Sequence, residues 1–323
     1  MHNAVLIARK EYLDAVYSRV LIVILLLLLG LMVSSIFVSS LLLHRQISEY
    51  QSSLITLQNL GKAPIEVQQV FPLTLLRGFI DYIEIIGAIL GILLGYYSIA
   101  KEKNQRTLQI LLTRPVKQSD IFMGKLLGNL AIIVSVLALV GVIAWLSLAF
   151  IGGITLQTSE IAKLSLALLF SVGYLIFFYC LSLILCMSVK SLSQGLMLCF
   201  TIWLVIVLII PQIGDTMDPD NQVPGGLFKS MHLNKDQEKQ VLAHFSGYET
   251  VRNAIEELSL TKHYERLSFA LLGIKDVFNG KSLVYIFEME WNDVLWILGW
   301  LFAGILASYY LMTRRDAFKE AKY

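Results

Sequence analysis

Residues 21–43 read LIVILLLLLGLMVSSIFVSSLLL and contain no charged side chain. A helix needs roughly 20 consecutive apolar residues to cross the hydrocarbon core of a bilayer, and this stretch is long enough. Backbone polar groups inside a bilayer must be satisfied within a helix or within a closed barrel. No run of about ten residues in the sequence shows the alternation that barrel strands require. The stretch therefore predicts a membrane-spanning α-helix.

The composition of the whole chain extends this prediction. Of the 323 residues, 56% are hydrophobic and 15% are charged, and the mean hydropathy of +0.68 is far from that of a soluble domain. Five further apolar runs follow, of which the first reaches spanning length only if it begins near Phe79. We therefore predict an all-α integral membrane protein with six transmembrane helices, an N-terminal amphipathic helix and a helical extracytosolic insertion between spans 5 and 6.

The expected segments, in chain order, are the cytosolic amphipathic helix at 1–20, TM1 at 21–43, an outer loop at 44–78, TM2 at 79–100, a cytosolic coupling segment at 101–125, TM3 at 126–152, TM4 at 162–188, TM5 at 192–213, the extracytosolic helical region at 214–292, TM6 at 293–313 and a cytosolic tail at 314–323.

The distribution of Lys and Arg predicts the orientation, because cytosolic connections carry an excess of these residues. With the N-terminus inside, the inner segments hold fourteen Lys and Arg and the short outer connections hold four. The long connection at 215–293 is left out, because long loops translocate regardless of charge. We expect a multi-pass protein of a prokaryotic cytoplasmic (inner) membrane with both termini in the cytosol. The formal net charge of +2 is too small to indicate a nucleic-acid partner.

The first twenty residues contain Glu11 and Asp14, which argue against a cleavable signal peptide. Apolar residues such as Val5, Tyr12 and Val16 fall about one turn apart. This spacing predicts an amphipathic helix whose basic residues reach lipid headgroups. A solvated leader with topogenic charges is the alternative.

Two regions are expected on the outer side. Residues 44–78 prolong the first span as a helix through Leu60, break at Gly61 and Pro64, and re-enter after Pro72. The region at 214–292 has the mixed composition of a soluble helical subdomain, with helical periodicity over 234–246, 248–260 and 262–278. Apolar residues available for a small core there are Val241, Leu242, Phe245, Val251, Ile255, Leu258, Leu267, Leu271 and Val277. The region could contact substrate or an outer partner, or serve as a structural lid.

The second span carries two further features. Asp81 and Glu84 lie one helical turn apart near its outer end, where they are either interfacial residues facing water or the outer mouth of a pathway. Deeper in the same helix, Gly87, Gly91 and Gly95 recur at every fourth residue and line one face. Small residues let helices approach closely, so this stripe predicts a helix contact, either within the subunit or at a dimer interface.

No set of residues indicates catalysis or a bound cofactor. Each Gly-Lys pair lacks the first glycine of a phosphate loop, because Thr56, Ser119 and Lys275 stand five residues before Gly61, Gly124 and Gly280. The five His residues are dispersed, and the three cysteines lie in predicted spans, which excludes an extracytosolic disulfide framework. A soft-metal site for Cu(I) is a weaker alternative, with the ligands Cys186, Met187, Met197 and Cys199. We expect neither catalytic residues nor a metal site, and any ATP that drives the protein must be hydrolysed by another polypeptide.

The polar segment between the second and third spans has an apolar motif of its own. Residues 102–115 read EKNQRTLQILLTRP, in which Asn104 can cap a short helix and Pro115 prevents its continuation. Leu108, Leu111 and Leu112 lie at helical spacing, which a simple loop does not need. The pattern predicts a rigid cytosolic knuckle that packs against a partner, and a membrane-surface helix is the alternative.

These residues resemble the permease subunits of the ABC-2 family of ATP-binding cassette transporters. The matching pattern is Glu102, Thr107-Leu108, Leu111-Leu112, Pro115 and the downstream Gly124-Lys125, and the N-terminal Ala8-Arg9-Lys10-Glu11 followed by six spans extends the likeness more loosely. Arg106 departs from the pattern, because the family often has glycine before the Thr-Leu pair. The architecture is most similar to NosY- and Nat-type permeases, whose ATPase is a separate polypeptide.

The resemblance implies a mechanism. Two permease subunits, as a homodimer or heterodimer, pair in the membrane lipid and two separate ATPase subunits bind below, carrying ATP and Mg. Contacts with the ATPase are implied for Glu102, Arg106, Thr107, Leu108, Leu111, Leu112 and Pro115. Because the spans offer little charge for an ionic solute, export of an amphipathic or apolar substrate is the leading expectation. The alternatives are a membrane scaffold that transmits ATPase motion to an extracytosolic partner and, less favoured, an ion-coupled carrier that uses Asp81 or Glu84.

Overall fold

The structure is a computed structural model that describes residues 2–59, 71–104, 117–153, 155–217, 227–231, 235–244 and 246–313. Within these ranges the regular elements are all helical, and six helices are long and apolar enough to cross a membrane. The predicted fold class, an all-α integral membrane protein with six spans, is therefore confirmed.

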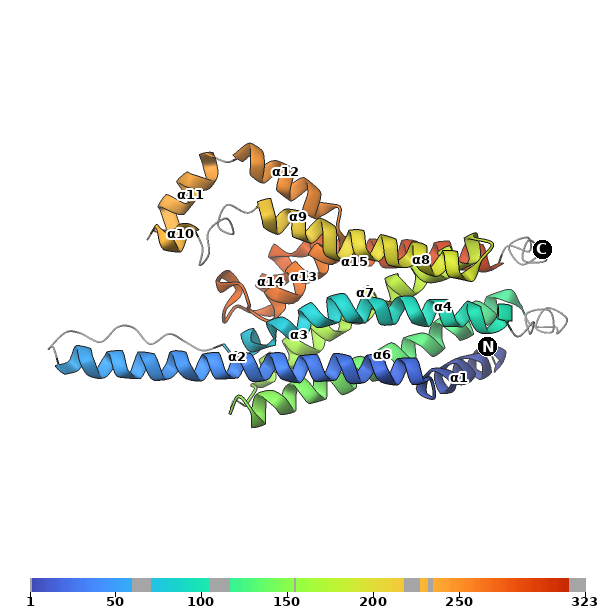
Figure 1. The fold of residues 1–323 in the computed structure, drawn as a ribbon, viewed down its shortest axis with the longest axis horizontal. Coiled ribbons are helices and arrows are strands. Elements are labelled where there is room, and N and C mark those ends of the chain that lie inside the picture. The colour runs from blue at the N-terminus through green and yellow to red at the C-terminus, as the bar shows by residue number, and fades with distance from the viewer. Residues whose placement is uncertain are drawn as a thin grey trace.

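The helices form an elongated bundle (Figure 1). Helix α1 is His2–Val16, and the six spanning helices follow in chain order: α2 (Arg19–Asn59), the second span built from η1 (Pro72–Leu76), α3 (Arg77–Tyr82), η2 (Ile83–Gly87) and α4 (Ala88–Asn104), then α6 (Gln118–Phe150), α7 (Thr158–Ser188), the fifth span built from α8 (Leu192–Trp203), η3 (Leu204–Ile209) and α9 (Ile210–Met217), and α15 (Trp291–Thr313). Between the fifth and sixth spans lie α10 (Leu227–Ser230), α11 (Lys235–His244), α12 (Ser246–Glu257), α13 (Leu260–Leu271), η5 (Asp276–Phe278) and α14 (Leu283–Met289).

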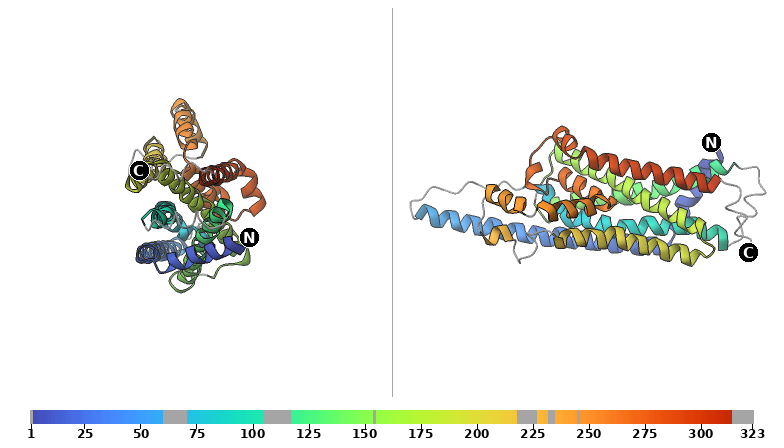
Figure 2. Two further views of the ribbon diagram at one scale, coloured as in Figure 1. Left: turned by 90° about the vertical axis from the view of Figure 1, so that its right-hand side faces the viewer. Right: turned by 90° about the horizontal axis from the view of Figure 1, so that it is seen from above.

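The two ends of the bundle differ in what they carry. Helix α1 and the last turns of α4 and α15 lie together at one end, here named the α1 end, which Figure 1 and the right view of Figure 2 show on the right. Helices α10–α14 and the far part of α2 lie at the other, here named the α13 end. The sequence predicts that the α1 end is cytosolic.

Helix α7 is the centre of the bundle. It contacts α4, α6, α8, α13 and α15, and its aromatic residues Tyr174, Phe178 and Tyr179 are fully buried. Helices α2, α8 and α15 instead expose much of their apolar surface, including Leu26, Met197 and Phe302. An apolar surface of this extent is unusual for a protein in water and expected for one surrounded by lipid.

Three of the spans are parts of longer helical segments. Helix α2 continues to Asn59, the second span begins at Pro72, and α6 begins at Gln118. The expected span limits at 43, 79 and 126 therefore fall inside these segments, and the first helix was expected to continue through Leu60. Polar residues can occupy helix ends that lie beyond the hydrocarbon, so hydropathy sets where a helix crosses the membrane but not where it stops.

The expected core of the 214–292 region forms only in part. Leu267 and Leu271 are buried, but Val251, Leu258 and Val277 are more than half exposed. Helix α13 does not pack chiefly within a separate subdomain, because it contacts α7, α15 and α3. Its apolar face is therefore buried against the ends of the spans.

Two spans contain a π-helical turn, η2 in the second and η3 in the fifth. Such turns free backbone carbonyls from the regular hydrogen-bond ladder. Tyr174 Oη donates to the Glu84 carbonyl at 3.1 Å, and Ser259 Oγ donates to the Ile206 carbonyl at 2.9 Å. Both donors belong to α7 or to the N-cap of α13, so the π turns are stabilised where α13 meets the spans.

Candidate functional site

At the α1 end, two glycines of α6 seat helix α1. A Cβ atom at Gly124 would lie 2.6 Å from Ile7 Cβ, and one at Gly128 would lie 2.7 Å from the Ala8 carbonyl oxygen. Real Cβ atoms essentially never approach this closely, so only glycine permits the observed contact. Helix α1 is thus docked backbone to backbone on the start of the third span.

Between these glycines, Lys125 is fully buried. Its ammonium lies 3.3 Å from Glu11 Oε1 of α1 and donates to the Ser98 carbonyl of α4 at 2.7 Å. A buried charge is costly unless it is paired and hydrogen-bonded. The pair therefore fastens three segments together: α1, the end of α4 and the start of α6.

Asn129, one turn further along α6, continues this network. Its side-chain amide donates to the Lys125 carbonyl at 2.9 Å and approaches Tyr179 Oη of α7 at 3.4 Å. The polar network thus reaches the central helix of the bundle, and displacement of α4 at this end would disturb hydrogen bonds in α6 and α7.

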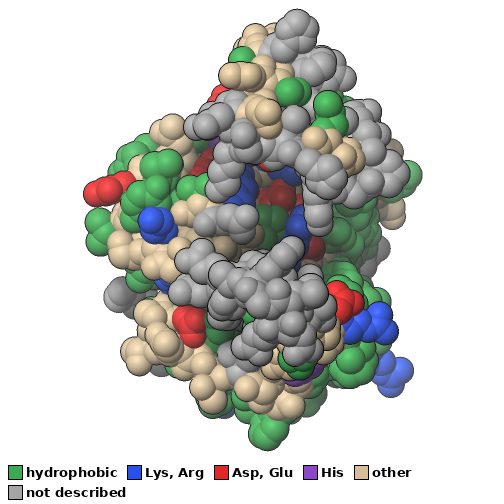
Figure 3. Space-filling view, turned by 90° about the vertical axis from the view of Figure 1, so that its left-hand side faces the viewer, with side chains coloured by type: hydrophobic (Ala, Val, Ile, Leu, Met, Phe, Trp, Pro, Cys, Tyr) green, Lys and Arg blue, Asp and Glu red, His purple; other side chains and the backbone are tan. Residues whose placement is uncertain are grey.

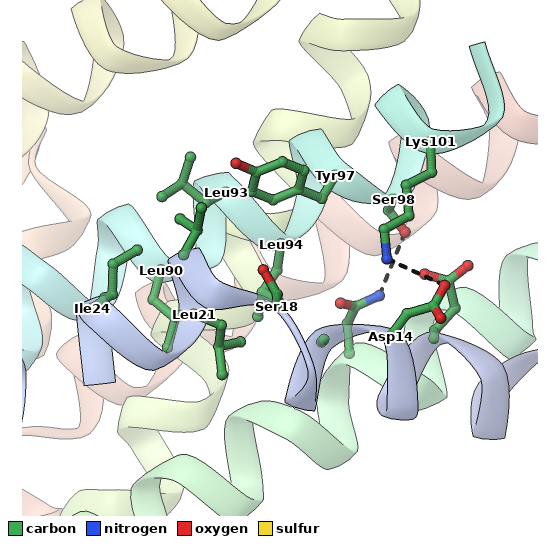
Figure 4. A pocket seen from close by; sticks show the side chains of 14 residues that line it. Asp14, Ser18, Leu21, Ile24, Leu90, Leu93, Leu94, Tyr97, Ser98 and Lys101 are labelled. Atoms are coloured by element: carbon green, nitrogen blue, oxygen red, sulfur yellow. Dashed lines mark hydrogen bonds and ion pairs between the residues drawn. The ribbon is translucent and has the colours of Figure 1, made fainter. Parts of the chain in front are cut away.

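A cavity opens beside the network, between α1, α2 and α4 (Figure 4). At one side of the cavity Lys101 Nζ lies 3.2 Å from Asp14 Oδ2, and both side chains are about one-third exposed. Below this ion pair the lining becomes apolar, with Leu21, Ile24 and Leu90 among the residues that face it.

The predicted ATPase-contacting residues begin where α4 ends. Glu102 lies in the last turn of α4, and nothing further is described of its side chain. Arg106, Thr107, Leu108, Leu111, Leu112 and Pro115 lie outside the described residues. The described flanks of this segment, Lys101 and Lys125, are joined to α1 through Asp14 and Glu11.

Of these features, sequence reasoning missed the burial of Lys125. The residue was expected in a cytosolic segment because a lysine beside an apolar run ordinarily marks the end of a span. The available signal was the small-xxx-small spacing of Gly124 and Gly128, which indicates that another helix packs over this turn.

The glycine stripe of the second span lies against α7 of the same chain. A Cβ atom at Gly91 would lie 2.5 Å from the Leu175 carbonyl oxygen, and one at Gly95 would lie 2.5 Å from the Tyr179 carbonyl oxygen. At Gly87 the nearest atom is Cδ1 of Leu175, at 3.1 Å. The stripe therefore permits close contact between α4 and α7 within the subunit.

At the α13 end, Asp81 and Glu84 are both at least partly buried, and α13 packs against the segment that carries them. Tyr264 of α13 stacks on Tyr174, with ring centroids 4.4 Å apart, and its hydroxyl lies 2.7 Å from Ser171 Oγ. Glu84 is buried and Asp81 is partly exposed, and both the interfacial role and the outer mouth of a pathway stay predictions. Burial raises the pKa of the Tyr264 hydroxyl well above its usual range.

Charged side chains gather around α13, and Figure 3 shows acidic and basic groups within a hollow on this face. Lys262 pairs with Glu265 at 2.9 Å, and Arg266 pairs with Glu256 of α12 at 2.5 Å. His263 Nδ1 lies 2.5 Å from Asp293 Oδ1 of α15, and its ring stacks on Trp296. The Arg266–Glu256 pair joins α13 to α12, and the His263–Asp293 contact joins α13 to α15.

Next to this cluster, Glu290 precedes α15 directly. Burial and the neighbouring Asp293 carboxyl group raise the pKa of Glu290 to about 7. This carboxyl group therefore titrates near neutral pH.

The residues of the alternative soft-metal site differ in exposure. Cys186 and Cys199 are buried, whereas the Met197 side chain is 69% exposed. Among the residues that the structure describes, no three His, Cys, Asp or Glu side chains are placed to hold a metal ion.

Comparison with known proteins agrees with this architecture. The model of a family described as "ABC-2 family transporter protein" matches residues 5–317, nearly the whole chain. A search of the curated proteins gave no match. The chain belongs to the ABC-2 family, and it is a membrane permease of an ABC transporter. The narrower likeness to NosY- and Nat-type subunits stays a prediction.

Proposed function

We propose that the chain is the membrane-spanning subunit of an ATP-driven exporter, that its α1 end lies in the cytosol, and that two copies of a separate ATPase subunit bind there. The ATPase would contact the segment that contains Leu108, Leu111 and Leu112. ATP and Mg would be held by that partner, and a second permease subunit would complete the transporter.

The observation that carries this proposal is the buried Lys125. Its bonds to Glu11 and to the Ser98 carbonyl join α1, α4 and α6 at the two ends of the segment 105–116. A force applied to that segment would be passed to both spans and, through Asn129, to α7. A subunit that hydrolyses no nucleotide itself needs such a rigid connection between its spans and the segment that a partner contacts.

The composition of the spans favours an amphipathic or apolar substrate. In the spans, the buried Lys125 is paired with Glu11 at 3.3 Å, and the buried Asp293 carboxyl group lies 2.5 Å from His263 Nδ1. An ionic solute would need unsatisfied polar groups along its path, whereas an apolar one needs only surface of the kind that these helices expose.

The association step is tested by Leu111→Asp. We expect this variant to insert normally but to lose co-purification with the ATPase from native membranes, because a carboxylate cannot be buried in an apolar groove without a large cost. Gln118→Asp is the matched control, because it adds the same charge at the first turn of α6, where a carboxylate is favourable. Unchanged association of the Leu111 variant would remove the proposed contact.

A second candidate function is favoured by the packing of α13. Because α13 is held by Tyr264, Ser259 and His263 against three different spans, motion of the spans would be carried to α10–α12. The chain would then transmit ATPase motion to an extracytosolic partner without moving solute. ATP-dependent flux of a fluorescent amphiphile into proteoliposomes that contain both subunits supports the exporter, whereas ATPase coupling without flux supports the transmitter.

A further inference from the structure

The cavity between α1, α2 and α4 has the two-zone lining of a lipid site. Its polar zone contains Asp14, Tyr97 and Lys101, and its apolar zone contains Leu21, Leu90 and other aliphatic residues. Figure 4 shows these side chains pointing toward a common space, with the Asp14–Lys101 ion pair at one side.

The two zones match the depth of a bilayer leaflet. Lys101 ends the second spanning segment, and α2 begins at Arg19, so the ion pair lies at the membrane boundary. Leu90 lies eleven residues deeper in the same helix, which is about 16 Å at 1.5 Å per residue. The cavity therefore runs from headgroup level to about the middle of the roughly 30 Å hydrocarbon core.

The size of the cavity indicates that it takes part of a larger molecule. Its volume is about 220 Å³, below the 300–1,000 Å³ that is typical of sites enclosing a whole drug-sized ligand. A membrane lipid can place its headgroup and one chain segment there while the remainder stays in the bilayer.

We propose that this cavity binds a zwitterionic phospholipid with a primary ammonium group, of the phosphatidylethanolamine type. Its ammonium would donate to the Asp14 carboxylate, and its phosphate would accept from Lys101. The headgroup would thereby exchange one protein ion pair, at 3.2 Å and partly exposed, for two charge-assisted hydrogen-bonded pairs.

The charges of the lining select this headgroup over the other common ones. A choline headgroup has no N–H to donate to Asp14. An anionic glycerol headgroup has no cationic group to pair with the Asp14 carboxylate, which lines the cavity. The site proposed here is independent of the substrate and of the direction of transport.

The test is lipid binding to the full chain in detergent micelles, measured by native mass spectrometry. Phosphatidylethanolamine, phosphatidylcholine and phosphatidylglycerol with identical acyl chains are titrated separately. We expect at least about tenfold tighter binding of the ethanolamine lipid than of the choline lipid, the order expected for one charge-assisted hydrogen bond. Equal binding of these two lipids, or tightest binding of the glycerol lipid, would overturn the proposal.

Two variants locate the site. Asp14→Asn is expected to reduce ethanolamine-lipid binding to the level of the choline lipid, because it removes the charge that the ammonium recognises. Leu93→Trp is expected to reduce binding by filling the apolar zone from a half-buried position on α4. Leu139→Trp is the control, because Leu139 is 44% exposed on α6 and does not line the cavity.

Circular dichroism and thermal melting confirm that each variant is folded. If both folded site variants keep the ethanolamine preference of the unmodified chain, the lipid binds elsewhere and the proposal is wrong. If Leu139→Trp alone lost the preference for the ethanolamine lipid over the choline lipid, the proposed site would also be wrong.

Discussion

The buried ion pair between Glu11 and Lys125 allows a quantitative prediction. The variants are Glu11→Leu, Lys125→Met and the double variant, all with apolar side chains of comparable length. Each single change leaves one buried charge without its partner, whereas the double change removes both charges together. If the pair fastens α1 to the bundle, the two substitutions must be strongly coupled.

The magnitude follows from the geometry. Two unit charges 3.3 Å apart attract each other by about 5 kcal/mol at an effective dielectric constant of about 20. Desolvation offsets much of this in the intact pair, but removal of one partner of a buried pair typically costs about 3–5 kcal/mol. Replacement of both partners by apolar residues is often close to neutral.

Hydrogen exchange of the α1 amides is the suitable assay, because detachment of α1 need not unfold the spans. A loss of about 3–5 kcal/mol corresponds to exchange that is faster by a factor of about one hundred to several thousand. We expect this acceleration in each single variant, and much less in the double variant. Amides of α7 near Tyr174 serve as an internal reference.

Additive effects would refute the reasoning. If the double variant exchanges as fast as the sum of the two single changes predicts, within about 0.5 kcal/mol, the two side chains are not energetically coupled. The two side chains would then be in contact without stabilising the docking of α1 on the bundle.

Two further predictions concern the stability of the subunit, measured as thermal unfolding in detergent. The pKa of Glu290 is raised from 4.5 to about 7 in the fold, so the folded state binds one more proton than the unfolded state between these pH values. The contribution of Glu290 to the free energy of unfolding is therefore fully present below about pH 4.5 and is lost as the pH rises through 7. We expect Glu290→Gln to weaken this pH dependence, and an unaltered profile would assign it to other groups. Gly91→Ala is expected to destabilise by about 1–3 kcal/mol because its methyl group would lie 2.5 Å from the Leu175 carbonyl oxygen. Gly30→Ala, with no atom within 4 Å of the added Cβ, should change little, and equal effects of the two changes would contradict the close-contact explanation.

The spans could be predicted from the sequence because each is a local property. An apolar run such as 21–43 is expected to lie in lipid whatever the rest of the chain does, and its length shows that a helix formed by it can cross the hydrocarbon core. A helix in the first twenty residues was likewise predicted from local spacing, and the structure describes α1 as His2–Val16.

The features that were not predicted depend on partners far away in the chain. Lys125 can be buried because Glu11, 114 residues earlier, pairs with it. The sequence around Lys125 does not identify Glu11 as its partner. Helix α13 has the amphipathic pattern of a surface helix, but its apolar face meets spans instead of a separate core. Burial on a neighbouring element and burial within a subdomain impose the same periodicity, so a single sequence does not distinguish them.

The length of α2 has a mechanical consequence. Its 41 residues span about 60 Å at 1.5 Å per residue, twice the thickness of the hydrocarbon core, and its far part projects past the other helices in Figure 1. Rigid tilting of such a rod by about 10° would carry a tip about 30 Å from the pivot through about 5 Å. A small change in the tilt of the first span inside the bilayer would thus displace the far end of α2 by several ångströms outside the hydrocarbon core.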